Sequence, residues 1–238
     1  MKQLIIILLA FLSNTASGQE KQGIAKYALI EDYSNLGESM LDTIQDESIK
    51  KIILAMREQS TNYDTIYFNL RFKSNISYFK SEEEVVPDGL NIYEIVASTM
   101  GEFYVDVEGG TSISLHELDG VYFRIEDDLF NVKWELTDEK RNINGYDCNK
   151  AITSYTETRE DGTERTYPIV AWYKDGFLEG HGPKGYGGLP GLIVELEFNP
   201  VTSFKLVSID LEEEVSIDKP TKGKKVTIDE YNAYVREN

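Results

Sequence analysis

The stretch GYGGLPGLIVELE, from Gly185 to Glu197, places four glycines and a proline directly before a run with strand periodicity. Pro190 and Gly191 suit the two central positions of a type II turn, because proline fixes φ at the first and glycine accepts a positive φ at the second. Apolar and acidic side chains then alternate, with Leu192, Val194 and Leu196 on one face and Glu195 and Glu197 on the other. The stretch therefore predicts a tight turn that leads a strand into the core.

The six residues Gly188, Leu189, Pro190, Gly191, Leu192 and Ile193 contain no reactive group, so we interpret them as a structural motif. We expect their glycines to lack side chains because neighbouring backbone or aromatic rings press against them. A valine at Gly191 would strain the predicted positive φ and destabilise the fold. A recognition loop is the alternative interpretation.

Short alternating runs bounded by Gly, Asn and Asp turns recur along the chain, which is typical of an antiparallel sheet. These runs cover 23–31, 64–72, 76–80, 102–107, 112–118, 121–126, 130–136, 166–174, 192–198 and 203–211. The pairs Asn144-Gly145 and Asp161-Gly162 are hairpin-turn signals on either side of the strand that contains Cys148.

Helical patterns occur near both ends of the chain. Apolar residues recur near helical spacing over 36–57, which predicts one long helix, and a shorter pattern covers 93–100. Thr227 and Glu230 can form the capping box of a short C-terminal helix. The predicted fold is mainly β (α+β): a single curved antiparallel sheet or half-barrel with one long helix on its N-terminal side. No repeat or clean linker divides residues 19–238, so we expect a single domain.

Residues 1–18 have the pattern of a secretory signal peptide. Lys2 supplies the positive charge, the apolar segment follows, and small residues stand at Ala16 and Gly18. The apolar segment is far shorter than the ~20 residues that span a bilayer. We therefore expect cleavage after Gly18 and a periplasmic or secreted protein without a transmembrane segment, a retained anchor being the alternative.

Four blocks in order resemble the GLPGLI family, named after the string from Gly188 to Ile193. Upstream, Trp134 and the segment INGYDCNKA (143–151) resemble the family's W…I-x-G-Y-x-C-x-K-A pattern, followed by AWY (171–173) and Gly182-Pro183. An acidic segment over 157–165 is longer than the family pattern. The resemblance implies an exported protein of Bacteroidota-type bacteria and implies no particular activity.

Charge excludes one class of partner. The net charge of −18 would repel the phosphates of a nucleic acid, and it disfavours adsorption to anionic lipid surfaces. A solvated acidic surface explains this charge, and attraction of a cationic partner or of metal ions is the alternative.

Reactive side chains are sparse. His116, His181 and Cys148 lack metal-ligand spacing, no nucleophile elbow is present, and the sequence indicates no metal and no cofactor. The single cysteine cannot form an intrachain disulfide. A buried strand thiol is one interpretation of Cys148, and a reactive thiol or an intermolecular bridge is the other.

Aromatic residues are the remaining signal for a site. Trp172, Tyr173, His181 and Tyr186 cluster around the glycine-rich stretch in the sequence, and they fit either core packing or a cleft for a ligand. We expect an exported, non-catalytic binding or accessory protein of the cell envelope that holds a hydrophobic or peptide-like ligand for an outer-membrane or periplasmic system. An extracytoplasmic hydrolase that uses His116 or His181, and a structural or assembly partner without a small ligand, are the alternatives. The sequence does not specify the ligand, the partner or the oligomeric state.

Overall fold

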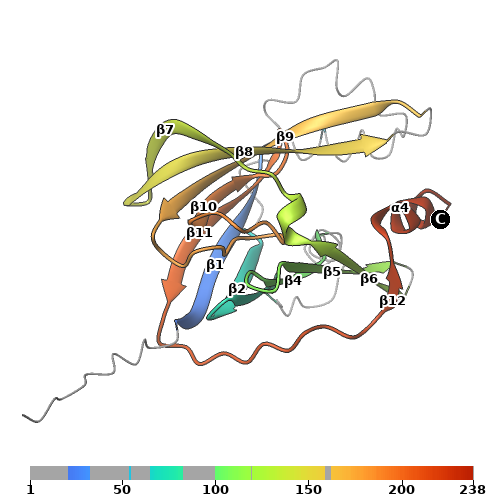
Figure 1. The fold of residues 1–238 in the computed structure, drawn as a ribbon, viewed down its shortest axis with the longest axis horizontal. Helices are drawn as coiled ribbons and strands as arrows, with labels where there is room; N and C mark the ends of the chain where they lie inside the picture. The colour runs from blue at the N-terminus through green and yellow to red at the C-terminus, as the bar shows by residue number, and fades with distance from the viewer. Residues whose placement is uncertain are drawn as a thin grey trace, which may run out of the picture.

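The computed structural model describes residues 21–32, 54, 65–82, 100–118, 120–158 and 162–237. Within these ranges one 12-stranded sheet forms, in the order β12-β6-β5-β4-β3-β2-β1-β11-β10-β9-β8-β7 (Figure 1). The strands are β1 (Gln22–Glu31), β2 (Tyr67–Lys73), β3 (Ile76–Ser81), β4 (Glu102–Asp106), β5 (Thr111–Leu118), β6 (Val121–Asp128), β7 (Glu135–Ile143), β8 (Tyr146–Thr158), β9 (Glu164–Asp175), β10 (Gly191–Glu197), β11 (Thr202–Asp210) and β12 (Lys224–Val226). A 3-10 helix, η2 (Leu129–Asn131), precedes β7, and the helix α4 (Ile228–Glu237) follows β12.

The sheet curves until the strands β7 to β9 face the strands β4 to β6, which leaves a concave side between these two arms (Figure 1). It does not close, because β7 and β12 remain at opposite edges of the strand order. Neighbouring strands are antiparallel except β12 and β6, which pair in parallel. The prediction of a mainly β fold built on one curved sheet is confirmed, and β12 is its parallel exception.

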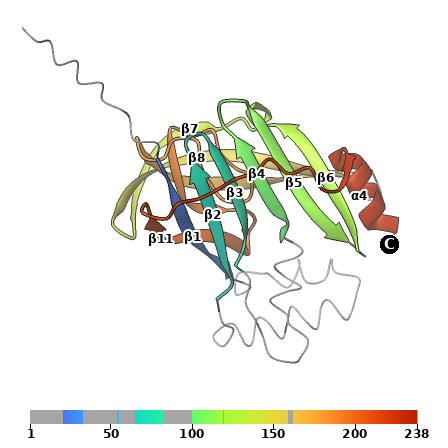
Figure 2. The same ribbon diagram turned by 90° about the horizontal axis from the view of Figure 1, so that it is seen from below.

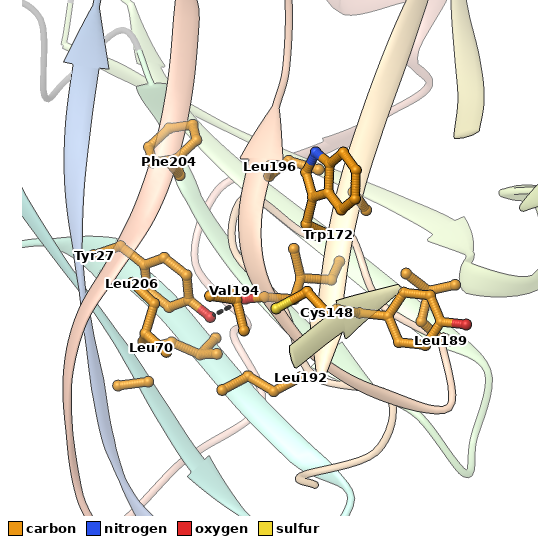
Figure 3. Packing of buried hydrophobic residues seen from close by; sticks show 14 of the residues in the cluster. Tyr27, Leu70, Cys148, Trp172, Leu189, Leu192, Val194, Leu196, Phe204 and Leu206 are labelled. Carbon is orange, nitrogen blue, oxygen red and sulfur yellow. Dashed lines mark hydrogen bonds between the residues drawn. The ribbon is translucent and has the colours of Figure 1, made fainter. Parts of the chain in front are cut away.

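The main core gathers around β10, which lies between β11 and β9 in the sheet. Leu192, Val194 and Leu196 are fully buried and pack with side chains of β1, β2 and β11 (Figure 3). The strict alternation that the sequence predicted is wrong, because a register shift between Ile193 and Glu195 interrupts it, and both of these residues are buried as well. The Tyr27 hydroxyl donates to the Ile193 carbonyl at 2.6 Å, which ties β1 to β10 inside the core. Burial of each large apolar side chain stabilises the fold by about 1.5–3 kcal/mol.

Local turn chemistry acts as the sequence predicted between β7 and β8. Asn144 has φ 50 and Gly145 has φ 86, so both central residues lie in the left-handed region that a type I′ hairpin turn requires. The Asn144 side-chain amide also donates to the Leu206 carbonyl at 3.1 Å, which fixes the turn against β11.

The segment 211–223, which we call the strap, leaves β11 and crosses the convex side of β2 to β6 before it enters β12 (Figure 2). The helix α4 then begins as predicted. The backbone N–H of Thr227 donates to the Glu230 carboxylate at 2.8 Å, and that of Glu230 donates to the Thr227 hydroxyl at 3.2 Å. This reciprocal pair is the predicted capping box.

One predicted strand differs from the structure, and two predicted helices lie almost entirely outside the described residues. Only residues 135–136 of the run 130–136 belong to a strand, β7, whereas η2 occupies the start of the run, because the Asp128 carboxylate caps the turn by accepting from the Phe130 N–H at 2.9 Å. The long helix expected over 36–57 is not confirmed, since only Leu54 of that segment belongs to the described residues, and only Met100 of the segment 93–100 does.

Within the described ranges, no helix combines the length and the apolar character that are needed to cross a bilayer.

Candidate functional site

Gly191 is a glycine for a different reason from the one that the sequence suggested. Its φ lies outside the left-handed region, so the predicted positive φ at this position is wrong; Gly188, with φ 79, adopts that conformation instead. A Cβ on Gly191 would lie 1.9 Å from the backbone oxygen of Lys174 on the neighbouring strand β9. The prediction that pressing backbone excludes a side chain is therefore confirmed at Gly191.

The residues 176–190, which we call the glycine loop, fold back on themselves beside β10. The N–H of Gly180 donates to the Leu189 carbonyl at 2.8 Å, and that of Gly188 donates to the Gly180 carbonyl at 3.1 Å. The Trp134 indole N–H donates to the Gly187 carbonyl at 2.9 Å. These bonds hold the loop as a fixed platform, and the loop carries Lys184 and Tyr186.

A cleft of about 1110 Å³ lies on the concave side beside this platform, and we call it the concave cleft. Its walls come from β4 to β6, from β8, from the glycine loop and from the start of α4. Four aromatic side chains line it: Phe103, Tyr155, Tyr186 and Phe198. Polar side chains of Ser112, Ser114, Asp127 and Asn232 interrupt this apolar lining. The volume and the mixture of groups are those of a site for a small amphipathic ligand.

Lys184 is the only lysine or arginine among the described residues that line the concave cleft. Its ammonium nitrogen lies 5.1 Å from the ring centre of Phe103 and 4.7 Å from that of Phe198, and it donates to the Met100 carbonyl at 3.2 Å. Burial lowers the pKa of Lys184 to about 8. The residue also has φ 55, a left-handed conformation that is strained for any side chain other than glycine.

His116 lies on the same wall, between the ring of Phe103 at 6.1 Å and that of Tyr231 from α4 at 4.8 Å, measured between ring centres. Burial, together with the positive charge of Lys184, lowers the pKa of His116 to about 4. The imidazole is therefore neutral near pH 7. In the part of the chain that the structure describes, no hydrogen bond joins His116 or His181 to a hydroxyl, thiol or carboxylate side chain.

Trp172 does not belong to the concave cleft. By strand alternation it lies on the convex side with Glu195, its register partner on β10. The guanidinium carbon of Arg141 lies 4.2 Å from the centre of the Trp172 ring, and Arg141 binds the buried Glu195 carboxylate at 2.9 Å. Lys205 contacts the same carboxylate at 3.4 Å. We call this set the convex-face cluster, and its charges are mutually paired.

The other predicted site residues are dispersed as well. Tyr186 lines the concave cleft, but Tyr173 and His181 are buried in the core. Nε2 of His181 donates to the Ser74 carbonyl at 2.8 Å, and burial lowers the pKa of this imidazole. The predicted aromatic group is thus divided, because Trp172, Tyr173 and Tyr186 face three different environments.

Cys148 is buried in the core cluster, as the interpretation of an apolar strand thiol requires (Figure 3). Burial raises the pKa of Cys148 to about 11, so the thiol is protonated near pH 7. A protonated thiol is a poor nucleophile. The geometry therefore favours packing over reactivity at this position.

A second cleft, of about 660 Å³, lies between the strap and the convex side of β2 to β6. Some of its polar groups are already engaged: the Tyr78 hydroxyl donates to the Glu102 carboxylate, and the Lys222 ammonium lies 3.1 Å from the centre of the Tyr122 ring. Among the described residues, no group of three or more His, Cys, Asp and Glu side chains is arranged to hold a metal ion.

Lys184 is the candidate site residue that sequence reasoning did not identify. A lysine between Pro183 and Gly185, two residues before Tyr186 in a strongly acidic chain, was a weak signal for it. Phe103 comes from β4 and Phe198 directly follows β10, so no local pattern could place these rings beside its ammonium.

No family model matches this chain, and no curated protein matches it significantly. Two solved structures of PNGF-II are similar in fold. The one in C2 space group has a TM-score of 0.54 at 12% identity and covers 91% of this chain, and the one in P21 space group has 0.52 at 12% and also covers 91%. This chain spans 33% of the length of each PNGF-II chain. At this identity the likeness shows the fold alone.

Proposed function

We propose that this protein is an exported, non-catalytic binding or accessory protein of the cell envelope, and that its concave cleft holds an apolar or peptide-like ligand. The observation that carries the proposal is the aromatic lining of a cleft of about 1110 Å³. Pockets of this size bury most of the surface of a small ligand. The signal-peptide pattern and the resemblance to the GLPGLI family support export, and with it a role beside an outer-membrane or periplasmic system.

The fixed glycine loop supports this proposal. Tyr186 packs with its ring centre 6.1 Å from that of Trp134 and 6.2 Å from that of Phe198. A wall whose rings are held by such contacts and by backbone hydrogen bonds loses little conformational entropy when a ligand binds. Preorganised apolar walls are what a binding protein needs.

The hydrolase alternative has less support. His116 and His181 contact aromatic rings and a backbone carbonyl, and a general base has to lie within hydrogen-bond reach of its nucleophile. The alternative of an assembly partner is favoured by no specific contact: the edge strand β7 carries exposed charged side chains, which disfavour pairing with another strand.

Titration of the purified protein with N-phenyl-1-naphthylamine, a neutral apolar fluorophore, tests the proposal. We expect saturable fluorescence enhancement, which Ser114→Phe abolishes because the new ring fills the concave cleft. Ser208→Phe is the matched control, since Ser208 is exposed on β11 and does not line the cleft. Absence of saturable binding, or equal loss in both variants, would contradict the proposal.

A further inference from the structure

The ammonium group of Lys184 lies in the concave cleft without a carboxylate partner. Asp127 and Asp229 line the same cleft, yet neither forms an ion pair with Lys184, and among the described residues no other carboxylate does. Its hydrogen-bond contacts are the Met100 carbonyl at 3.2 Å and the Met100 sulfur at 3.9 Å, the latter a weak acceptor. Lys184 is half-buried, and an ammonium that is withdrawn from water in this way normally has a paired charge, because its partial desolvation is unfavourable.

The backbone of Lys184 adds a second unfavourable feature at the same residue. Its φ of 55 is a strained conformation for a non-glycine side chain, and such strain is concentrated at binding and catalytic sites. The neighbouring residue Gly185 is so close to the Phe103 ring that a Cβ there would lie 2.8 Å from it. The chain thus holds Lys184 tightly against an aromatic wall.

We propose that the ligand of the concave cleft carries a carboxylate on an apolar body, and that Lys184 binds this carboxylate between the rings of Phe103 and Phe198; this inference rests on the proposed function. An anion at this point would supply the charge that the ammonium lacks. The apolar part of the ligand would then contact Tyr186 and the other rings of the cleft. Asp127 and Asp229 disfavour anions bound elsewhere on these walls.

The charges in the cleft disfavour a dianion more than a monoanion. One ammonium faces two carboxylates among the described lining residues, so a doubly charged phosphate would meet about twice the net repulsion that a monoanion meets. The hydroxyls of Ser112 and Ser114 line the wall next to Lys184 and are neutral donors that suit a carboxylate oxygen. Both a fatty acid and the C-terminus of an apolar peptide have this chemistry.

Displacement of N-phenyl-1-naphthylamine at pH 7 tests the inference with matched competitors. We expect decanoate to compete about tenfold better than decanol, which has the same chain without the charge, and decyltrimethylammonium to compete worst. A short apolar peptide with a free C-terminus, compared with its C-terminal amide, forms the second arm. Preference for the free acid in one arm or the other assigns the source of the carboxylate.

Variants then assign the preference to one side chain. In Lys184→Met we expect decanoate to lose about tenfold in affinity, while decanol and the fluorophore change by less than about twofold. Lys184→Arg should retain the preference for the acid. Lys222→Met is the matched control, because Lys222 belongs to the strap, contacts the Tyr122 ring and lies outside the concave cleft.

The outcomes separate the two proposals. If the neutral fluorophore does not bind the wild-type protein, the proposed function fails and takes the inference with it. If the fluorophore binds but decanoate competes no better than decanol in wild type, or equally well in wild type and Lys184→Met, the carboxylate inference is overturned while the proposed function stands.

Discussion

Each side of the sheet places a cation against aromatic rings, but only the convex side pairs its cation with a carboxylate. On the convex side, Arg141 lies over Trp172 and binds Glu195, which also contacts Lys205. On the concave side, Lys184 lies beside Phe103 and Phe198, and no described carboxylate pairs with it. A cation that contacts a ring and also pairs with a carboxylate of the protein stabilises the fold. A cation that contacts rings but has no carboxylate partner can bind the anionic group of a ligand.

Gly191 joins these two regions, because the glycine loop with Lys184 leads through it into the strand with Glu195. We expect Gly191→Val to lose more than about 3 kcal/mol of unfolding free energy, since its Cβ would meet the Lys174 backbone oxygen. Gly188→Val is the comparison: at φ 79 it is strained, yet nothing lies within 4 Å of a Cβ there, so about 1–2 kcal/mol is expected. Urea denaturation measures both. Equal losses of unfolding free energy in the two variants would show that backbone conformation, and not contact with β9, is the reason for glycine at position 191.

Removal of the convex-face carboxylate should have the next largest effect. In Glu195→Gln the cations Arg141 and Lys205 lose their buried counter-charge, and we expect a loss of about 1–3 kcal/mol in unfolding free energy. The Glu195 side chain is 7% exposed, whereas that of Glu197 is 42% exposed at 3.9 Å from Arg141. Glu197→Gln should therefore change stability by less than about 1 kcal/mol. A larger loss of unfolding free energy in Glu197→Gln than in Glu195→Gln would show that Glu195 is not the main counter-charge of Arg141 and Lys205.

Removal of the concave-side cation, Lys184, should increase the stability of the protein. We expect Lys184→Met to gain on the order of 1 kcal/mol in unfolding free energy at pH 7 without ligand, after allowance for residual solvent contact and lost ring contacts. Stability and binding would then oppose each other at this residue. A clear loss of stability in Lys184→Met would indicate that Lys184 is a structural residue.

The gain in Lys184→Met should depend on pH in a defined direction. The pKa of Lys184 is about 8 in the folded protein and 10.5 in the reference state, so the unfolded chain binds more protons between these values. Wild-type stability from this group therefore rises with pH through that window, and the advantage of Lys184→Met shrinks above pH 8. The titratable groups that share the concave cleft are His116, Asp127, Tyr155, Tyr186 and Asp229. Denaturation at pH 7 and pH 10, with Lys222→Met as the control, measures the difference.

Local patterns in the sequence predicted much of the fold. The turn at Asn144 and the capping box at Thr227 are confirmed, since each depends on residues a few positions apart. The burial of Leu192, Val194 and Leu196 is confirmed as well, but a register shift between Ile193 and Glu195 interrupts their predicted alternation. The candidate site was predicted only in part. Tyr186 lines the concave cleft, but Trp172 lies on the other side of the sheet, because strand alternation directs neighbouring residues to opposite faces.

The sequence by itself determined that this chain forms a curved, mainly β sheet with a fully buried strand after its glycine-rich turn. Periodicity and φ preferences act over a few residues, so they can be read without coordinates. Only the tertiary structure decided that Lys184 faces Phe103 and Phe198 without a described carboxylate, and that contact with β9 requires Gly191. Those contacts join strands far apart in the chain, and their register follows from packing of the whole sheet.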